Sequence, residues 1–171
     1  TNAFAVRDNF SLEYAPTDYM RLRVRIGISK TADESESFTS PEDTRYDKTD
    51  ILNKGAYSNS RSDIWSYDGE FSMTYGQLIA EKHQLNLVAG VSLNESNSSS
   101  KGFSGQGFPE GGFSSPGFIN TYPEGDKPSY SEDVSRDVSF YFNGGYSYQN
   151  RYLMDVNLRS DGTSIFGANK R

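Results

Sequence analysis

The residue types that carry most enzymatic chemistry are scarce in this chain of 171 residues. Cysteine is absent and His83 is the single histidine, which leaves no thiol nucleophile or disulfide framework and little material for a histidine-based triad or metal site. The sequence contains no nucleophile elbow, phosphate-cradling glycine loop or zinc signature. We therefore predict a protein that is not an enzyme and that uses no cofactor or metal ion.

The clearest charged feature is a row of arginines. Arg21, Arg23 and Arg25 alternate with apolar residues, so they share one face of an extended segment. Carboxylates such as Asp68 and Glu70, on the polar side of another alternating segment, are their expected partners, and a solvated pair of this kind contributes little to stability. The alternative interpretation is a cationic track for an anionic substrate.

A glycine–phenylalanine pair recurs at five-residue spacing from Gly102 to Phe118. The rings belong to Phe103, Phe108, Phe113 and Phe118, and Tyr122 follows shortly after them. Glycine permits sharp turns, whereas each phenylalanine needs apolar surroundings. Two interpretations remain open: a loop folded back with its rings buried against neighbouring loops, or a set of aromatic platforms that contact a ligand or a partner protein.

A cluster of acidic residues follows the arginine row, made up of Asp33, Glu34, Glu36, Glu42 and Asp43. Carboxylate oxygens are ligands for calcium, which takes six to eight of them. Their spacing does not form an EF-hand, and charges in loops are usually solvated. We favour the solvated loop and keep calcium as the alternative.

The elements that position these residues are strands. Over residues 20–28 every even position is apolar, while the odd positions hold three arginines and a glycine. A strand gathers these residues onto one aliphatic and one cationic face, whereas a helix scatters the arginines around its surface. Five further segments follow the same alternation less strictly, at residues 4–14, 65–75, 85–93, 138–148 and 152–158.

These segments form three predicted strand pairs, at about 3–29, 64–93 and 137–160, each closed by a short turn. Long polar segments, at about 30–62 and 94–136, connect the pairs. In an antiparallel meander of about six strands, the short turns share one end and the long loops share the other. Outer-membrane barrels have this arrangement, and their strands of about 9–11 residues match the predicted lengths.

Composition narrows the alternatives. Twelve tyrosines, 11 phenylalanines and 16 glycines favour an all-β chain. The net charge of −6 argues against a broad nucleic-acid surface, and the sequence has no apolar run long enough for a transmembrane helix. A soluble antiparallel sheet also buries one face, so alternation alone does not separate it from a membrane barrel. The long loops and the aromatic residues near strand ends favour the barrel.

The C-terminal part resembles a known family. Residues 145–153, an aromatic strand with the sequence GYSYQNRYL, run into residues 158–171, LRSDGTSIFGANKR. Together they are similar to a stretch typical of SusC/RagA-type TonB-dependent outer-membrane transporters. Residues 83–90 resemble a further strand of that family, and Phe108-Pro109 resembles part of the following loop. Ile165 departs from the family pattern, which usually has a basic residue there, and this leaves the electrostatic role of that loop in doubt.

The resemblance implies that residues 1–171 are part of a 22-stranded barrel in the outer membrane of a Gram-negative bacterium. It implies an importer of oligosaccharides or peptides, driven through TonB by a region outside this chain. A SusD-like surface lipoprotein would be its partner, and outer-membrane lipid would surround it. The charges at Arg21, Arg23, Arg25, Asp68 and Glu70 would then line the lumen. A soluble β-sandwich that binds glycans, or an adhesin-like module, is the alternative function.

The chain starts at Thr1 without a signal-peptide pattern, and we expect it to be a piece of a longer protein. Six strands do not close a barrel of 22, so the isolated piece has two sheet edges and a lipid-facing surface. We expect it to form an open sheet, a sandwich or a small barrel. Curling or self-association would hide the face that carries Leu22, Val24 and Ile26.

Overall fold

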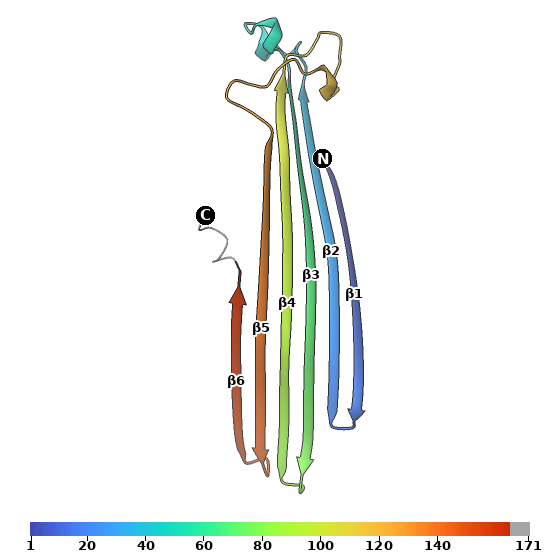
Figure 1. The fold of residues 1–171 in the computed structure, drawn as a ribbon, viewed down its shortest axis with the longest axis vertical. Coiled ribbons are helices and arrows are strands. Elements are labelled where there is room, and N and C mark those ends of the chain that lie inside the picture. Colours follow the sequence, from blue (N-terminus) through green and yellow to red (C-terminus); the bar gives the residue numbers. More distant parts are fainter. Residues whose placement is uncertain (165–171) are drawn as a thin grey trace. The chain divides into compact units, whose positions relative to one another are not determined.

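The computed structural model of the chain describes residues 1–164. Residues 165–171, which complete the family-like motif and include Ile165, lie outside that range. The described residues form one six-stranded sheet in the meander order β1-β2-β3-β4-β5-β6 (Figure 1). The strands are β1 (Asn2–Thr17), β2 (Met20–Thr39), β3 (Ala56–Ile79), β4 (His83–Gln106), β5 (Ser129–Tyr148) and β6 (Tyr152–Thr163). The predicted all-β antiparallel meander is confirmed.

In the described part of the chain, helical structure is limited to single 3-10 turns in the long connections. These are η1 (Thr44–Tyr46), η2 (Ile51–Asn53) and η3 (Pro116–Phe118). Among residues 1–164, the structure has no helix with the length and apolar character required to span a membrane.

The strands extend further than the alternation of apolar residues predicted. The connections between hairpins cover residues 40–55 and 107–128, in place of the expected 30–62 and 94–136. Serine, threonine and glutamate residues of the predicted loops join the ends of β2 and β4, because backbone pairing between neighbouring strands continues where the apolar alternation has stopped. Periodicity reports which face is apolar, and it therefore misses strand residues with polar side chains on both faces.

The described chain divides into two compact units. Unit 1 contains Thr1–Val6, Lys30–Ile64 and Ser98–Asp133, and unit 2 contains Arg7–Ser29, Trp65–Asn97 and the chain from Val134 onward. All three hairpin turns belong to unit 2, and both long connections belong to unit 1.

Turns of unit 2 are tight and are tied to one another. Ala80, Glu81, Gln149 and Asn150 have positive φ angles between 48° and 57°, as two-residue hairpin turns of the I′ type require. The backbone N–H of Gln149 donates to the carbonyl oxygen of Lys82 at 2.7 Å, which joins the second and third hairpins. Gly76 donates in the same way to the carbonyl of Tyr19 at 2.8 Å and joins the first and second.

Unit 1 has a small core of its own around Phe108, whose exposed fraction is 2%. The Phe108 ring lies edge-on to Phe38, with 5.1 Å between ring centroids. The backbone N–H groups of Gly107 and Phe108 both donate to the carbonyl of Lys54, at 3.1 and 2.8 Å. The two long connections are therefore fastened to each other at this point.

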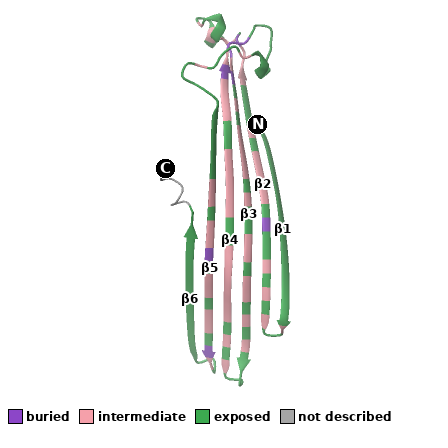
Figure 2. Cartoon of the chain, in the orientation of Figure 1, coloured by how far each residue is buried: buried purple, intermediate pink, exposed green. Residues whose placement is uncertain are grey.

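The sheet does not close, and β1 and β6 are its edges. Both edge strands are exposed along almost their whole length (Figure 2). The apolar side of β2 is also uncovered in part, since Ile26 is 50% exposed. Of the three forms expected for the isolated segment, the structure shows the open sheet, and the curled forms, a sandwich or a small barrel, are not formed by the described residues. A small barrel needs β1 paired with β6 at a matching stagger, and a sandwich needs a second sheet, whereas this meander provides only neighbour-to-neighbour pairing. Self-association stays a prediction.

Candidate functional site

One face of the sheet in unit 2 carries an uncovered layer of apolar side chains, here called the apolar band. On the inner strands it consists of Leu22, Val24, Ile26 and Ile28 of β2, Tyr67, Phe71 and Met73 of β3, Leu85, Leu87, Ala89, Val91 and Leu93 of β4, and Val138, Phe140 and Phe142 of β5. Phe10 and Leu12 of β1 and Met154, Val156 and Leu158 of β6 continue it to the edges. The exposed fractions of Phe140 and Leu158 are 58% and 62%. A continuous apolar surface of this extent marks contact with a membrane or with another protein.

An aromatic cluster limits the apolar band at the end with the short turns. The rings of Tyr19 and Tyr75 lie 5.5 Å apart. His83 Nδ1 lies 2.7 Å from the hydroxyl of Tyr146, and its ring is 4.9 Å from that of Tyr148. Amphipathic rings of this kind are enriched where a bilayer meets water, because they place an apolar body and a polar tip side by side.

The opposite limit of the band in β3 is set by Trp65 and Tyr67, whose rings stack at 6.3 Å. Trp65 and Tyr75 are ten positions apart, which is roughly 33 Å along a strand. A strand tilted by about 40° would turn this length into a band about 25 Å tall, the height of the lipid-facing band of outer-membrane barrels.

Beyond that limit, the strand positions on the side of the apolar band carry charged side chains in place of apolar ones. In β4, Leu93 is followed by Glu95, and in β5, Val138 is preceded by Arg136. Arg136 and Glu95 form an ion pair with an N–O distance of 2.8 Å. In β3, Trp65 is preceded by Asp63. The two neighbouring strands β4 and β5 therefore lose their apolar character at positions that face each other, and β3 does so further along; the sequence alone indicated only the start of a loop there.

The opposite, polar face of unit 2 contains most of the charges that the sequence singled out. Arg23 pairs with Glu13 at 2.7 Å, and Arg21 lies 3.9 Å from the same carboxylate. Arg25 pairs with Glu70 at 2.6 Å, as expected from the sequence. Among the described residues Asp68 forms no ion pair.

Glu70 also accepts a hydrogen bond from the hydroxyl of Tyr141, at 2.7 Å. Tyr141 lies on β5 and Glu70 on β3, so the tyrosine reaches across β4 at Gly90. A methyl group on Gly90 would overlap the Tyr141 ring, which shows that the missing side chain provides the space. Arg25, Glu70 and Tyr141 thus form a bridge across four strands, here called the polar brace. Neither Tyr141 nor Gly90 was predicted from the sequence, although a tyrosine at a polar-face position of β5 was a usable signal.

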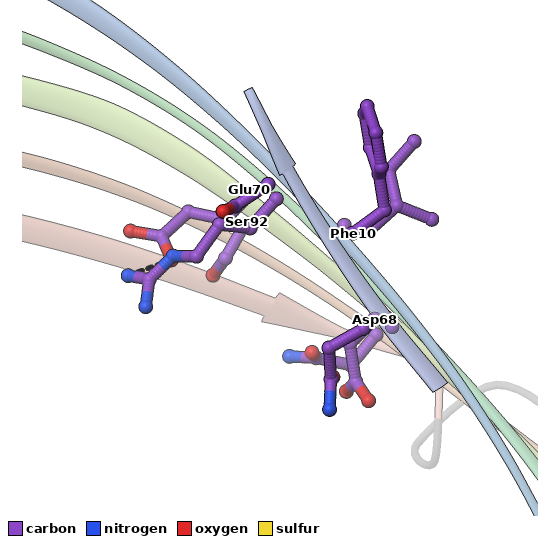
Figure 3. Close-up of a pocket in the computed structure, with 11 residues that line it drawn as sticks. Phe10, Asp68, Glu70 and Ser92 are labelled. Carbon is purple, nitrogen blue, oxygen red and sulfur yellow. Dashed lines mark ion pairs between the residues drawn. The ribbon is translucent and has the colours of Figure 1, made fainter. Parts of the chain in front are cut away.

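Next to the polar brace lies a hollow of about 460 Å³ (Figure 3). Its polar lining consists of Asn9, Ser11, Arg25, Asp68, Glu70, Ser92 and Asn94. In Figure 3 the side chain of Phe10 projects away from those of Asp68 and Glu70, in keeping with the alternation of the two faces.

The glycine–phenylalanine repeat divides into two structural halves. Phe103 packs against Tyr57 at 5.8 Å and Phe108 is buried, so these rings serve the loop core. Phe113 and Phe118 contact each other at 4.9 Å, and each keeps 45% of its surface exposed. Tyr122 is also exposed. A contact with a ligand or partner protein stays a prediction for Phe113, Phe118 and Tyr122 and for the partly exposed Phe103, whereas Phe108 has almost no exposed surface for it.

Acidic residues of the predicted loop have separate partners in unit 1. Glu36 accepts a hydrogen bond from the hydroxyl of Tyr57 at 2.9 Å, and burial together with this carboxylate raises the pKa of that phenol. Asp43 accepts from the Arg45 side chain, which lowers the pKa of the Asp43 carboxyl. No group of three or more metal-ligating side chains occurs in the part of the chain that the structure describes, so the calcium interpretation gains no support.

An open antiparallel meander with one apolar and one polar face has the fold of a wall segment of a transmembrane β-barrel. Solved structures of the RagAB peptide transporter share this fold: one covers 99% of this chain with a TM-score of 0.85 and 21% sequence identity. The RagAB peptide importer in its "closed-closed" and "open-open" states matches over the same share with TM-scores of 0.79 and 0.79. The barrel-segment fold implied by the SusC/RagA-type resemblance is therefore confirmed.

The likeness has a defined extent. The chain spans 18% of the length of each of these solved chains, and an identity of 21% establishes the fold alone. No protein-family model matches the sequence, and comparison with curated proteins gives no match.

Proposed function

We propose that this chain is a wall segment of a TonB-dependent outer-membrane importer. The observation that carries the proposal is the combination of a barrel-segment fold with an apolar band that no described residue covers. In the assembled barrel the apolar band faces lipid, and the polar face, with Arg21, Arg23, Arg25, Asp68 and Glu70, lines the lumen. The segment provides the passage and makes or breaks no covalent bond.

Two features support the membrane over a soluble β-sandwich. A sandwich places its apolar face against a second sheet, whereas here the described residues provide only one sheet. The apolar band also has an aromatic limit at each end in β3, at Trp65 and Tyr75, with a spacing suited to a bilayer. An adhesin-like module has no need for either feature.

The proposed partner is a SusD-like surface lipoprotein, and the proposed cargo is a peptide or an oligosaccharide. Exposed rings at Phe113, Phe118 and Tyr122 supply an aromatic surface suited to such a contact. The similar solved structures are of a peptide transporter, which favours peptides as the first cargo to test. Energy would reach the barrel through TonB, by way of a region outside this chain.

The test is made on the full-length gene product. Membrane fractionation is expected to place it in the outer membrane, and a deletion strain is expected to lose uptake of labelled oligopeptides and to regain it with the intact gene. The control is the deletion strain that carries the gene of an unrelated outer-membrane barrel in place of this one. Recovery of the full-length product in the soluble fraction would overturn the proposal.

A further inference from the structure

The hollow beside the polar brace has the chemistry of a binding site. We propose that the hollow around Asp68 binds a cationic group, a guanidinium or a primary ammonium. This inference rests on the proposed function in one respect only, namely that the polar face lines a water-filled passage.

The charges around the hollow do not balance. Arg25 is the one cation among its lining residues, and it is already paired with Glu70 at 2.6 Å. Glu70 in turn has its second oxygen occupied by the hydroxyl of Tyr141. Asp68 remains without an ion pair among the described residues. The residues that line the hollow therefore have one excess negative charge. Because Arg25 is paired with Glu70, a cation that enters the hollow can pair with Asp68.

The geometry places oxygen atoms around an open floor. Gly27 forms the floor, and a methyl group added to it would lie 2.9 Å from Asn9 Oδ1 and 3.5 Å from Asp68 Oδ2. These two oxygens belong to β1 and β3 and converge above β2, where the missing side chain leaves room. Ser92 and Asn94 of β4 line the other side. The Asn94 side-chain amide donates to Asp68 Oδ1 at 3.0 Å, which leaves Asp68 Oδ2, Asn9 Oδ1 and the Ser92 hydroxyl oxygen as acceptors. A guanidinium or ammonium group has only donors, so these acceptors match it, whereas an anion would face Asp68.

The cation has two possible sources with the same chemistry. It belongs either to a basic residue of the transported peptide or to a lysine or arginine elsewhere in the longer protein. A hollow of about 460 Å³ accommodates a side chain of that size in either case.

The test compares wild-type full-length protein with Asp68→Asn, which removes the charge and keeps the shape. Asp155→Asn is the matched control, because Asp155 lies on the same polar face, against Gly145, and outside the hollow. The probes are two labelled tetrapeptides that differ only in one residue, arginine or its neutral isostere citrulline. Their uptake is measured at low and at moderate salt.

For a peptide cation, Asp68→Asn is expected to reduce arginine-probe uptake by about threefold to tenfold, the effect of losing one partly solvated charge-assisted contact. Uptake of the citrulline probe stays unchanged, and the loss shrinks as salt increases. For a cation within the protein itself, both probes lose uptake equally and the melting temperature of purified Asp68→Asn decreases. Either result supports a cation site.

The proposal is overturned if Asp68→Asn changes neither probe selectivity nor melting temperature, or if Asp155→Asn produces the same change. A binding measurement separates this inference from the transporter proposal. The arginine probe should raise the melting temperature of purified wild-type protein more than that of Asp68→Asn. That difference would persist even if the protein proved not to transport either probe.

Discussion

A single charged side chain in the apolar band should distinguish the two faces of the sheet. Ala89 lies on the outward face of β4, midway between Leu85 and Leu93, and its neighbour Val88 lies on the polar face. In a barrel, Ala89→Arg places a guanidinium near the bilayer midplane at a cost of about 2–4 kcal/mol. Val88→Arg places the same group toward water and should cost less than about 1 kcal/mol.

The expected difference of about 1–4 kcal/mol corresponds to roughly a fivefold to several-hundredfold change in the folding equilibrium. Folding is measured by urea titration of the full-length barrel in lipid vesicles, with abundance in the outer membrane as a second readout. Because the two positions are adjacent in one strand, they share nearly the same depth and receive the same new side chain, and they differ mainly in the face. Equal destabilisation by the two substitutions, or greater damage from Val88→Arg, would refute the assignment of the faces.

Three further changes test the described contacts. Tyr141→Phe should cost about 1.5 kcal/mol in urea titration, the low end of the range for a hydrogen bond to a charged group, because the Glu70 side chain is partly exposed. Gly90→Ala should displace the Tyr141 ring and cost at least as much, and a Gly90→Ala variant with unchanged stability would contradict the polar brace. Phe108→Ala should loosen both long connections and increase limited proteolysis between residues 40 and 55, whereas Phe113→Ala, which removes an exposed ring, should leave that pattern unchanged. Because the pKa of Tyr57 is raised, its contribution to stability is present below the unfolded tyrosine pKa and is lost as pH rises through the higher folded value. The difference between the ultraviolet titrations of wild type and Tyr57→Phe should therefore show a phenol that ionises above the unfolded range, and a difference at or below that range would contradict the contact with Glu36.

The sequence was sufficient for the fold because the apolar alternation and the hairpin turns are local. The strict pattern at residues 20–28 predicted β2, and the short connections predicted the meander. The predicted strands stopped near Ile28, Leu93 and Asp137 because the apolar side chains stop there, while the backbone pairing continues past these points.

The polar face was predictable only in part. The pairing of Arg25 with Glu70 required opposite charges on neighbouring strands, which a sequence displays. The contact between Tyr141 and Glu70 depends on the register of three strands and on a missing side chain at Gly90. Local patterns do not contain that information, because register is a property of paired strands. The same limit applies to the phenylalanine repeat, whose members look equivalent in sequence although Phe108 is buried and Phe113 is exposed.

The assignment of one face to lipid and of the other to water is tested most directly by accessibility along β4. Single cysteines at successive positions from 85 to 92, in full-length protein without other cysteines and in native membranes, are spin-labelled and exposed to oxygen and to a water-soluble nickel complex. Labels at odd positions should collide mainly with oxygen and labels at even positions mainly with nickel, with a period of two. Uniform accessibility to nickel, or protection of the odd positions from both reagents, would contradict the account.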